Sequence, residues 1–421
     1  MTSLSQEMSS PAPVAAKPPQ EVLGLARLMT HAFRGGDLRP VASELIVRAE
    51  HDEKDAAALM DLSTVLFLQG LPELGLATQS QALDLCRHYR LLPPEGSVPR
   101  LQMLALMTTG DLMTNTPLAF LLEDGEVALD MLYLRPGEGL PSTLPPHDLL
   151  FVAVSESDAT HAVLARLAAE LPTDAPGLIN HPAGILRTAR DQAFIALQGA
   201  PGIVMPASAR VGRLSLEAVG KRRLDVREVL ADGVFPLIVR PVDSHAGHGL
   251  ERVATPQDLT TYLAAHGEDA FFVSRFIDYS GADGLFRKYR VVMVRGQAFA
   301  AHMGVSTHWM IHYLNAGMDE SVAKREEEAQ VMANFEQQFA QRHAQALRAI
   351  DARMAMPYLG IDCAETPDGR LLVFEADNAM IVHAMDAEQM YPYKRPVMQK
   401  VFEAFRAMLA RAASSLQSDI A

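Results

Sequence analysis

Three carboxylates in the stretch 358–383 have the types and spacing of a metal site. Asp362 lies in an alternating apolar segment, and Glu375 and Asp377 end a second apolar run beyond the turn signal Pro367-Asp368-Gly369. A hairpin would bring Asp362 beside Glu375 and Asp377, which share a strand face. These oxygens suit Mg²⁺ or Mn²⁺, usually with nucleotide phosphates completing the shell. The alternative is a surface hairpin whose acids are solvated.

Two cations precede this stretch on a predicted strand. The pattern over 286–300 predicts a hairpin around Arg295-Gly296-Gln297. Lys288 and Arg290 alternate on its first strand, so they share one face. Paired cations on a sheet face suit phosphate or carboxylate binding, and plain surface charge is the alternative.

A small-residue segment follows the buried strand predicted over 235–239. Such a turn can cover phosphates with backbone N–H groups, with a cation nearby, although a plain hairpin fits the same residues. Its candidate binding residues are Arg240, Ser244, His245, Gly247 and Gly249.

Three histidines follow the cation pair within residues 302–312. His308 and His312 are four residues apart, which on a helix would put both on one face. The carboxylate cluster is the better metal site, so His302, His308 and His312 are interpreted as structural or substrate-contacting residues.

Such groups need a framework, and the segment 98–182 supplies an α/β one. Apolar strands predicted over 101–107, 127–134 and 148–154 alternate with helices, which indicates a mostly parallel sheet. Loops after such strands commonly hold ligands, so 108–111 and 155–157 are further candidates, with ordinary turns as the alternative.

The segment 21–95 is predicted to be helical. Its clearest helices, 56–68 and 73–90, resemble a tetratricopeptide pair, but about two repeats are fewer than a stable stack usually needs. This region is either a partner-binding module, through residues 21–90, or a packing appendage. Residues 1–20, rich in Ser, Pro, Ala and Gln, are expected to be disordered.

The bulk properties exclude several classes of protein. A chain of 421 residues allows two or three domains, and its net charge of −14 argues against nucleic-acid binding. Two distant cysteines indicate no disulfide framework and a reducing, cytoplasmic setting. No apolar run is long enough for a membrane span, and no secretory signal is recognised. Nothing in the sequence indicates an oligomeric state.

Three features occur in order within residues 100–415: the cation-bearing turn, the Lys288/Arg290 strand and the acidic hairpin. Together they resemble the ATP-grasp superfamily. The resemblance is to the group of glutathione synthetase and the ribosomal-protein glutamate ligases. It implies an α/β and α+β multidomain fold, here preceded by the helical region. An N-terminal domain (98–182) would lie before two lobes (183–421) that clamp ATP. It also implies an ATP-dependent carboxylate–amine or carboxylate–thiol ligase that works through an acyl phosphate on a small-molecule or peptide substrate.

The resemblance also implies roles for particular residues. Mg²⁺ would be held by Asp362, Glu375 and Asp377, with Asn378 in reserve. Arg240 stands where the family has a phosphate-binding lysine, and the turn 244–249 would cover the phosphates. Adenine would be bound by the backbone of Ser274, Arg275, Phe276 and Ile277. Lys288 would lie near ribose or phosphates, and Arg290 near the acyl phosphate.

Two departures from the family pattern keep other functions open. A family lysine is replaced by Gln192, which removes one cation unless Arg187, Arg190 or Lys221 substitutes. No arginine lies between Arg295 and Arg325, so the candidates for the missing arginine's role are His302, His308 and His312. These changes are compatible with an ATP-binding pseudoenzyme. A third hypothesis is an interaction protein that works through residues 21–90.

Overall fold

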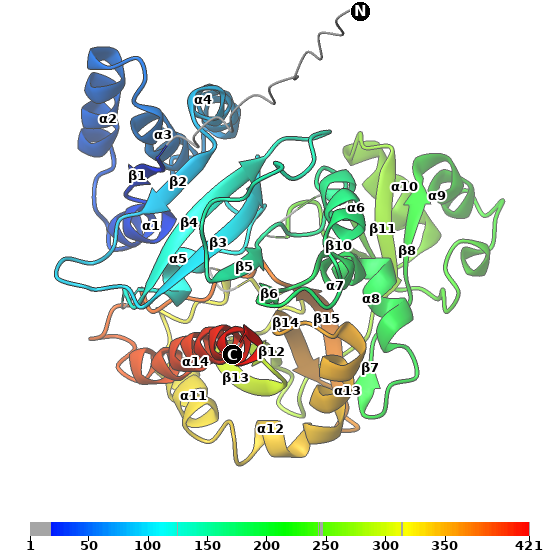
Figure 1. Cartoon of the computed structure of the whole chain (residues 1–421). Helices are drawn as coiled ribbons and strands as arrows, with labels where there is room; N and C mark the ends of the chain where they lie inside the picture. Colours follow the sequence, from blue (N-terminus) through cyan, green and yellow to red (C-terminus); the bar gives the residue numbers. More distant parts are fainter. Residues whose placement is uncertain (1–17, 124, 243, 245–246, 313–314, 421) are drawn as a thin grey trace, which may run out of the picture.

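The chain folds into a mixed α/β structure with three sheets (Figure 1). The computed structural model describes residues 18–123, 125–242, 244, 247–312 and 315–420, so most of the predicted disordered tail lies outside the described residues. The strand orders are β1-β2-β4-β3-β5-β6, β10-β9-β11-β8 and β13-β12-β14-β15-β7. In the described part of the chain, no helix has the length and apolarity to cross a bilayer.

The six-stranded sheet contains the predicted parallel core. Strand β3 (Leu101–Thr108) pairs in parallel with β4 (Val127–Leu134) and β5 (Leu149–Val152), and β5 pairs with β6 (Leu178–Ile179). Their apolar residues are buried, as expected for a parallel sheet covered on both faces. Helix α5 (Leu118–Leu121) connects β3 to β4, the longer α6 (His161–Glu170) connects β5 to β6, and the short α7 (Pro182–Ile185) follows β6.

The segment 21–95 contains strands as well as helices, which corrects the all-helical prediction. Four helices are present: α1 (Leu25–Phe33), α2 (Arg39–His51), α3 (Ala56–Leu68) and α4 (Pro72–Leu85). The last helix ends before His88–Leu91, which forms β2, antiparallel to β4. Strand β1 (Gln20–Val22) pairs in parallel with β2. Tyr89 and Arg90 explain the change, because Tyr89 is fully buried and Arg90 binds the buried Asp130 at 2.6 Å.

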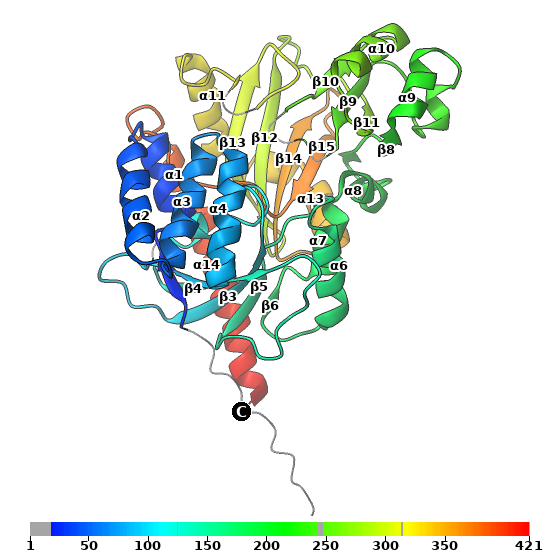
Figure 2. The ribbon, with the colours of Figure 1, turned by 90° about the horizontal axis from the view of Figure 1, so that it is seen from above.

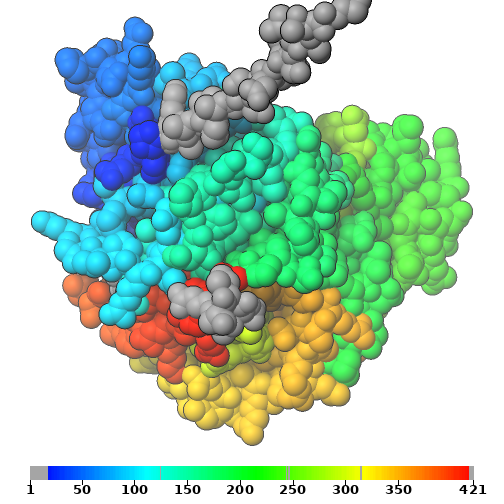
Figure 3. All heavy atoms as spheres, in the orientation of Figure 1, coloured from blue at the N-terminus to red at the C-terminus, as the bar shows by residue number. Residues whose placement is uncertain are grey.

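The four-stranded sheet forms a separate lobe, at the right of Figure 1. It consists of β8 (Ser208–Gly212), β9 (Leu237–Pro241), β10 (Glu251–Val253) and β11 (Ala270–Arg275), all antiparallel to their neighbours. Helices α9 (Arg213–Gly220) and α10 (Pro256–Ala265) bury its apolar side. Figure 3 shows this lobe in green, on the opposite side of the molecule from the blue N-terminal helices.

The five-stranded sheet contains both predicted hairpins, which are confirmed. Strands β12 (Phe286–Val294) and β13 (Gln297–Ser306) turn at Arg295 and Gly296, both with positive φ, as a two-residue hairpin turn requires. Strands β14 (Tyr358–Glu365) and β15 (Leu371–Asp377) form the acidic hairpin, and β7 (Ile203–Val204) pairs with β15.

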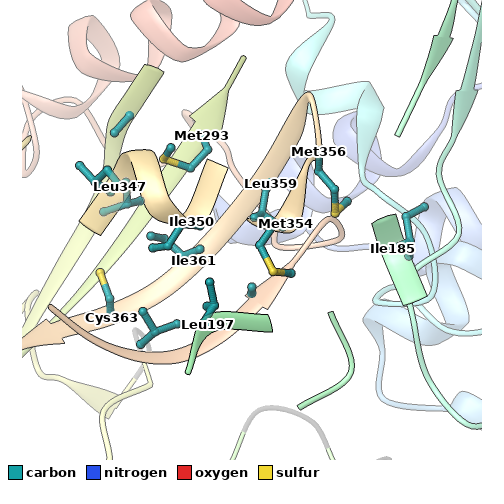
Figure 4. Close-up of a cluster of buried hydrophobic side chains, with 14 of the residues drawn as sticks. Ile185, Leu197, Met293, Leu347, Ile350, Met354, Met356, Leu359, Ile361 and Cys363 are labelled. Carbon is teal, nitrogen blue, oxygen red and sulfur yellow. The ribbon is translucent and has the colours of Figure 1, made fainter. Parts of the chain in front are cut away.

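Helices cover this sheet on both faces (Figure 2). Three helices lie in residues 322–354: α11 (Val322–Ala333), α12 (Phe339–Arg342) and α13 (Ala344–Met354). Figure 4 shows Ile350 of α13 against Ile361, in a cluster that also holds Leu197 of α8 (Arg190–Leu197). On the other face, α14 (Lys394–Ile420) packs between the two larger sheets. The acidic hairpin is therefore fixed from both sides.

Candidate functional site

A cavity of about 420 Å³ lies between the four-stranded lobe and the hairpins of the five-stranded sheet. The four-stranded lobe, the five-stranded sheet and the N-terminal α/β part all contribute to its wall. The predicted site residues that line it are Arg240, Ser244, Gly247, Ser274, Arg275, Phe276, Ile277, Lys288, Arg290, Asp362, Glu375 and Asp377. Residues separated by more than 130 positions in the chain therefore meet at one site.

Four predicted site residues are not among those lining the cavity. His245 lies outside the described residues. Gly249, at the end of the turn predicted to cover phosphates, accepts a hydrogen bond from the Tyr262 hydroxyl at 2.8 Å through its carbonyl. His302 lies on β13 opposite Arg290, where burial and the charges of Arg290 and Lys394 hold its pKa well below the ordinary value. The fourth, Asn378, is described below. Of the three candidate histidines, His312 lines the cavity.

Asp362 is bound by both predicted cations. Arg290 donates from Nε to Oδ1 at 2.8 Å and from Nη2 to Oδ2 at 3.0 Å, and Lys288 Nζ lies 2.6 Å from Oδ2. Strand register produces the pairing, because Arg290 and Asp362 are direct partners across β12 and β14. Burial alone would raise the pKa of Asp362, but the two cations bring it far below the ordinary value. Asp362 is therefore a fully buried, neutralised carboxylate.

Glu375 continues this charged row onto the next strand. It is the direct partner of Asp362 across β14 and β15, and it accepts a hydrogen bond from Arg190 at the start of α8. Burial opposes ionisation of Glu375, but the charge of Arg190 lowers its pKa overall. Register shifts beside Arg290 and beside Asp362 show that both strands are irregular here, a common way to redirect side chains at a site.

Asp377 differs from the other two carboxylates. Burial raises its pKa to about 6, and it accepts a hydrogen bond from the backbone N–H of Ala379 at 2.8 Å. Glu375 and Asp377 are half-buried and both line the cavity. They therefore present carboxylate oxygens to any ligand that enters it.

The predicted four-residue metal site is not assembled in this arrangement. Among the described residues, no group of three or more His, Cys, Asp or Glu side chains is positioned to hold a metal ion. The oxygens of Asp362 are taken by Arg290 and Lys288, so the two cations supply the neutralisation that a metal was expected to supply. Glu375 and Asp377 remain as the hard oxygen donors that suit Mg²⁺ or Mn²⁺.

Asn378, the predicted reserve ligand, has another structural role. Its buried amide donates to Thr116 Oγ1 at 3.0 Å, to the Val154 carbonyl at 3.1 Å and to the Ala153 carbonyl at 3.3 Å. These bonds join the end of β15 to the six-stranded sheet. No local sequence signal could have indicated them, because the partners are more than 200 residues away in the chain.

Further cations lie on the lobe side of the cavity. Arg240, on β9, donates to Ser244 Oγ at 3.1 Å, and burial together with the charge of Arg190 lowers its pKa to about 10. Arg190 was considered in the sequence only as a substitute cation, yet it lines the cavity and binds Glu375. Arg190, Arg240 and Lys288 thus place positive charge on several sides of one space, as polyanion binding requires.

The part of the wall near the predicted adenine-binding stretch is mostly apolar. Phe276 lies under the Arg252 guanidinium at 4.4 Å and meets the Trp309 ring edge-on at 5.8 Å. Ile238 and Leu372 also line the cavity. An apolar wall of this kind suits an aromatic base, and Trp309 could not be assigned to it from sequence, because it lies on a distant loop.

The N-terminal α/β part closes the cavity. Of the two loops proposed from the strand pattern, the one after β5 lines the cavity with Glu156 and Ser157, whereas residues 108–111 are not among the lining residues. Glu156 pairs with His161 Nδ1 at 3.0 Å, and burial raises the pKa of its carboxyl. A ligand reaching this wall would meet an acidic surface.

Comparisons with known proteins found similar solved structures but no similar sequence family. No protein-family model and no curated protein sequence matches this chain. Among solved structures, the D-alanine–D-alanine ligase of Coxiella burnetii aligns over 76% of this chain and 98% of its own, with 14% identity and a TM-score of 0.46. The VanG D-Ala:D-Ser ligase of Enterococcus faecalis aligns over 73% and 99%, with 12% identity and a TM-score of 0.45.

A third similar structure is the RimK domain ATP-grasp protein of Sphaerobacter thermophilus. It aligns over 73% of this chain and 99% of its own, with 16% identity and a TM-score of 0.39. All three scores are below 0.5, so a function for this chain has to be supported by its own residues.

Proposed function

We propose that this protein is an ATP-dependent ligase of the ATP-grasp type, which joins a carboxylate to an amine or a thiol. The observation that carries the proposal is the charged row from Lys288 and Arg290 through Asp362 to Glu375 and Arg190, inside a cavity with an apolar wall. Cations suit a polyphosphate, carboxylates suit the divalent ion that accompanies it, and the apolar wall suits the base.

In the proposed reaction, a substrate carboxylate oxygen attacks the γ-phosphorus of ATP, and ADP leaves. The amine or thiol then attacks the acyl carbon, and inorganic phosphate leaves as the proton of the nucleophile is lost. Arg240, Arg190 and Lys288 would bind phosphate oxygens, and Arg290 would face the acyl phosphate. Mg²⁺ or Mn²⁺, held by Glu375 and Asp377 with Asp362, would neutralise charge on the phosphates. Catalysis by positioning and charge neutralisation is sufficient for this chemistry.

The acceptor is proposed to be a small molecule or a peptide. Glu156 and Ser157 of the N-terminal part also line the cavity, and the second substrate is proposed to bind on that side. The test is ADP release with a panel of amino acids, peptides and thiols, each with its carboxylate partner. ADP release that depends on both substrates supports a ligase, and ATP hydrolysis that no acceptor changes contradicts it.

An ATP-binding protein without turnover is the second candidate. The observation in its favour is Gln192, which is exposed on α8 and bonds to the neighbouring Asp191 rather than lining the cavity. This candidate predicts nucleotide binding that Glu375→Ala weakens, together with no ADP release for any acceptor.

A further inference from the structure

The side chains around Asp362 pose a problem for metal binding. Its carboxylate is fully buried, and Arg290 and Lys288 together occupy both oxygens. A divalent ion that approached alone would meet two fixed positive charges instead of a free carboxylate. If the cations moved aside without a replacement partner, they would lose their ion pairs and a buried charge would be left unpaired, which is strongly unfavourable.

A nucleotide polyphosphate removes this obstacle. Lys288 and Arg290 line the same cavity as Arg240 and Glu375, so phosphates bound there would lie within reach of both cations. Phosphate oxygens are strong acceptors for lysine and arginine. A phosphate can also accept a bidentate pair of hydrogen bonds from arginine, as Asp362 now does from Arg290. The carboxylate oxygens released in this way become available to the metal.

We propose that Lys288 and Arg290 mask Asp362 in the free protein, so that the divalent ion binds tightly only together with the nucleotide. The inference rests on the proposed function. In binding, the two cations exchange a carboxylate for phosphate oxygens, and Asp362 exchanges two cations for one divalent ion. Metal and nucleotide are then thermodynamically coupled, and each raises the affinity for the other by the same factor.

The test measures binding of Mn²⁺ alone, from the electron paramagnetic resonance signal of free Mn²⁺, without nucleotide. Lys288→Met removes one masking charge and should bind Mn²⁺ at least tenfold more tightly than the wild type. Arg287→Met is the matched control, because Arg287 is the adjacent residue on β12 but pairs with Asp283 and Glu327. It should bind Mn²⁺ as the wild type does. Equal Mn²⁺ affinity in wild type and Lys288→Met would overturn the proposal.

A second measurement needs no variant. The thermal midpoint of the wild type should be unchanged by Mn²⁺ alone and raised by Mn²⁺ with a non-hydrolysable ATP analogue. A full shift with Mn²⁺ alone, together with binding of the analogue, refutes the masking and leaves the ligase proposal intact. No shift with the complex contradicts the ligase proposal itself.

Discussion

Asn378 and Thr116, 262 residues apart in the chain, are joined by a hydrogen bond of 3.0 Å between Nδ2 and Oγ1. The same amide also donates to two carbonyls of the residues that follow β5. The side chain of Asn180, which follows β6, forms two hydrogen bonds with the backbone of Tyr358, at the start of β14. Its Nδ2 donates to the Tyr358 carbonyl at 2.9 Å, and its Oδ1 accepts from the Tyr358 N–H at 3.0 Å. Two buried asparagines therefore attach the open end of the acidic hairpin to the six-stranded sheet.

Asn378→Ala should lower the free energy of unfolding by about 1–3 kcal/mol, because buried carbonyls and a hydroxyl lose their donor. Urea denaturation measures the change. Thr116→Val removes one of the partners, and the double variant should lose less than the sum of the two single losses. Strict additivity would show that the two side chains are not coupled.

Ligand binding should stabilise the protein through Glu375. At about one hundred times its dissociation constant, Mg²⁺–ATP should raise stability by about 2.7 kcal/mol if it binds only the native state. Glu375→Ala should reduce the increase in thermal midpoint, because it removes a proposed metal donor and releases Arg190. Glu336→Ala is the control, because Glu336 is distant from the cavity lining and pairs with Lys400 on the surface. An unchanged increase in the Glu375 variant would argue against a nucleotide at this hairpin.

His383 should make stability depend on pH. Burial lowers its pKa to about 4, its Nδ1 accepts from the Met385 N–H, and its ring packs against Phe33 and Phe120. At this site the native protein therefore binds fewer protons than the unfolded chain between pH 4 and 6.5. The contribution of His383 to stability is present above pH 6.5 and is lost as pH falls toward 4. The loss is at most about 3 kcal/mol.

His383→Phe should remove this contribution, so that the stability of the variant relative to the wild type rises as pH falls, measured by urea denaturation at pH 4.5, 5.5 and 7. His51→Gln, on the exposed face of α2, should leave the slope as in the wild type. A wild-type slope that survives in His383→Phe would assign the pH dependence to another group.

Ile350→Ala should destabilise the support of the acidic hairpin. Ile350 is fully buried between α13 and β14, where Figure 4 shows it against Ile361. Removing its methyl and methylene groups should cost about 2–5 kcal/mol in free energy of unfolding, since the space cannot fully collapse. Leu214→Ala, at a side chain that is 81% exposed, should change stability by less than about 0.5 kcal/mol. Comparable losses in the two variants would contradict this packing.

Local signals were sufficient to predict the hairpins. The alternation in β12 and β14, with Gly296 at one turn and Pro367 to Gly369 at the other, specified the strands and the loop between them. The same alternation placed Lys288 with Arg290 and Glu375 with Asp377. These features depend on residues close in sequence, which is where pattern reasoning is strongest.

Contacts between distant segments were not predictable in the same way. The direct pairing of Arg290 with Asp362 depends on the register between β12 and β14, which the sequence between them does not reveal. Strands β1 and β2 are only three and four residues long, so the surrounding helical pattern obscured them. The role of Asn378 depends on Thr116, in another part of the fold.

The insertion of α1 to α4 between two neighbouring parallel strands has a consequence for shortening the chain. A protein that began at residue 96 would lose β1 and β2 together with the four helices, and β4 would become the outer strand of the sheet. Its row of unpaired backbone N–H and C=O groups would be open to strands of other molecules, and Asp130 would lose Arg90. The N-terminal quarter thus covers this edge of the sheet, and its removal should favour aggregation.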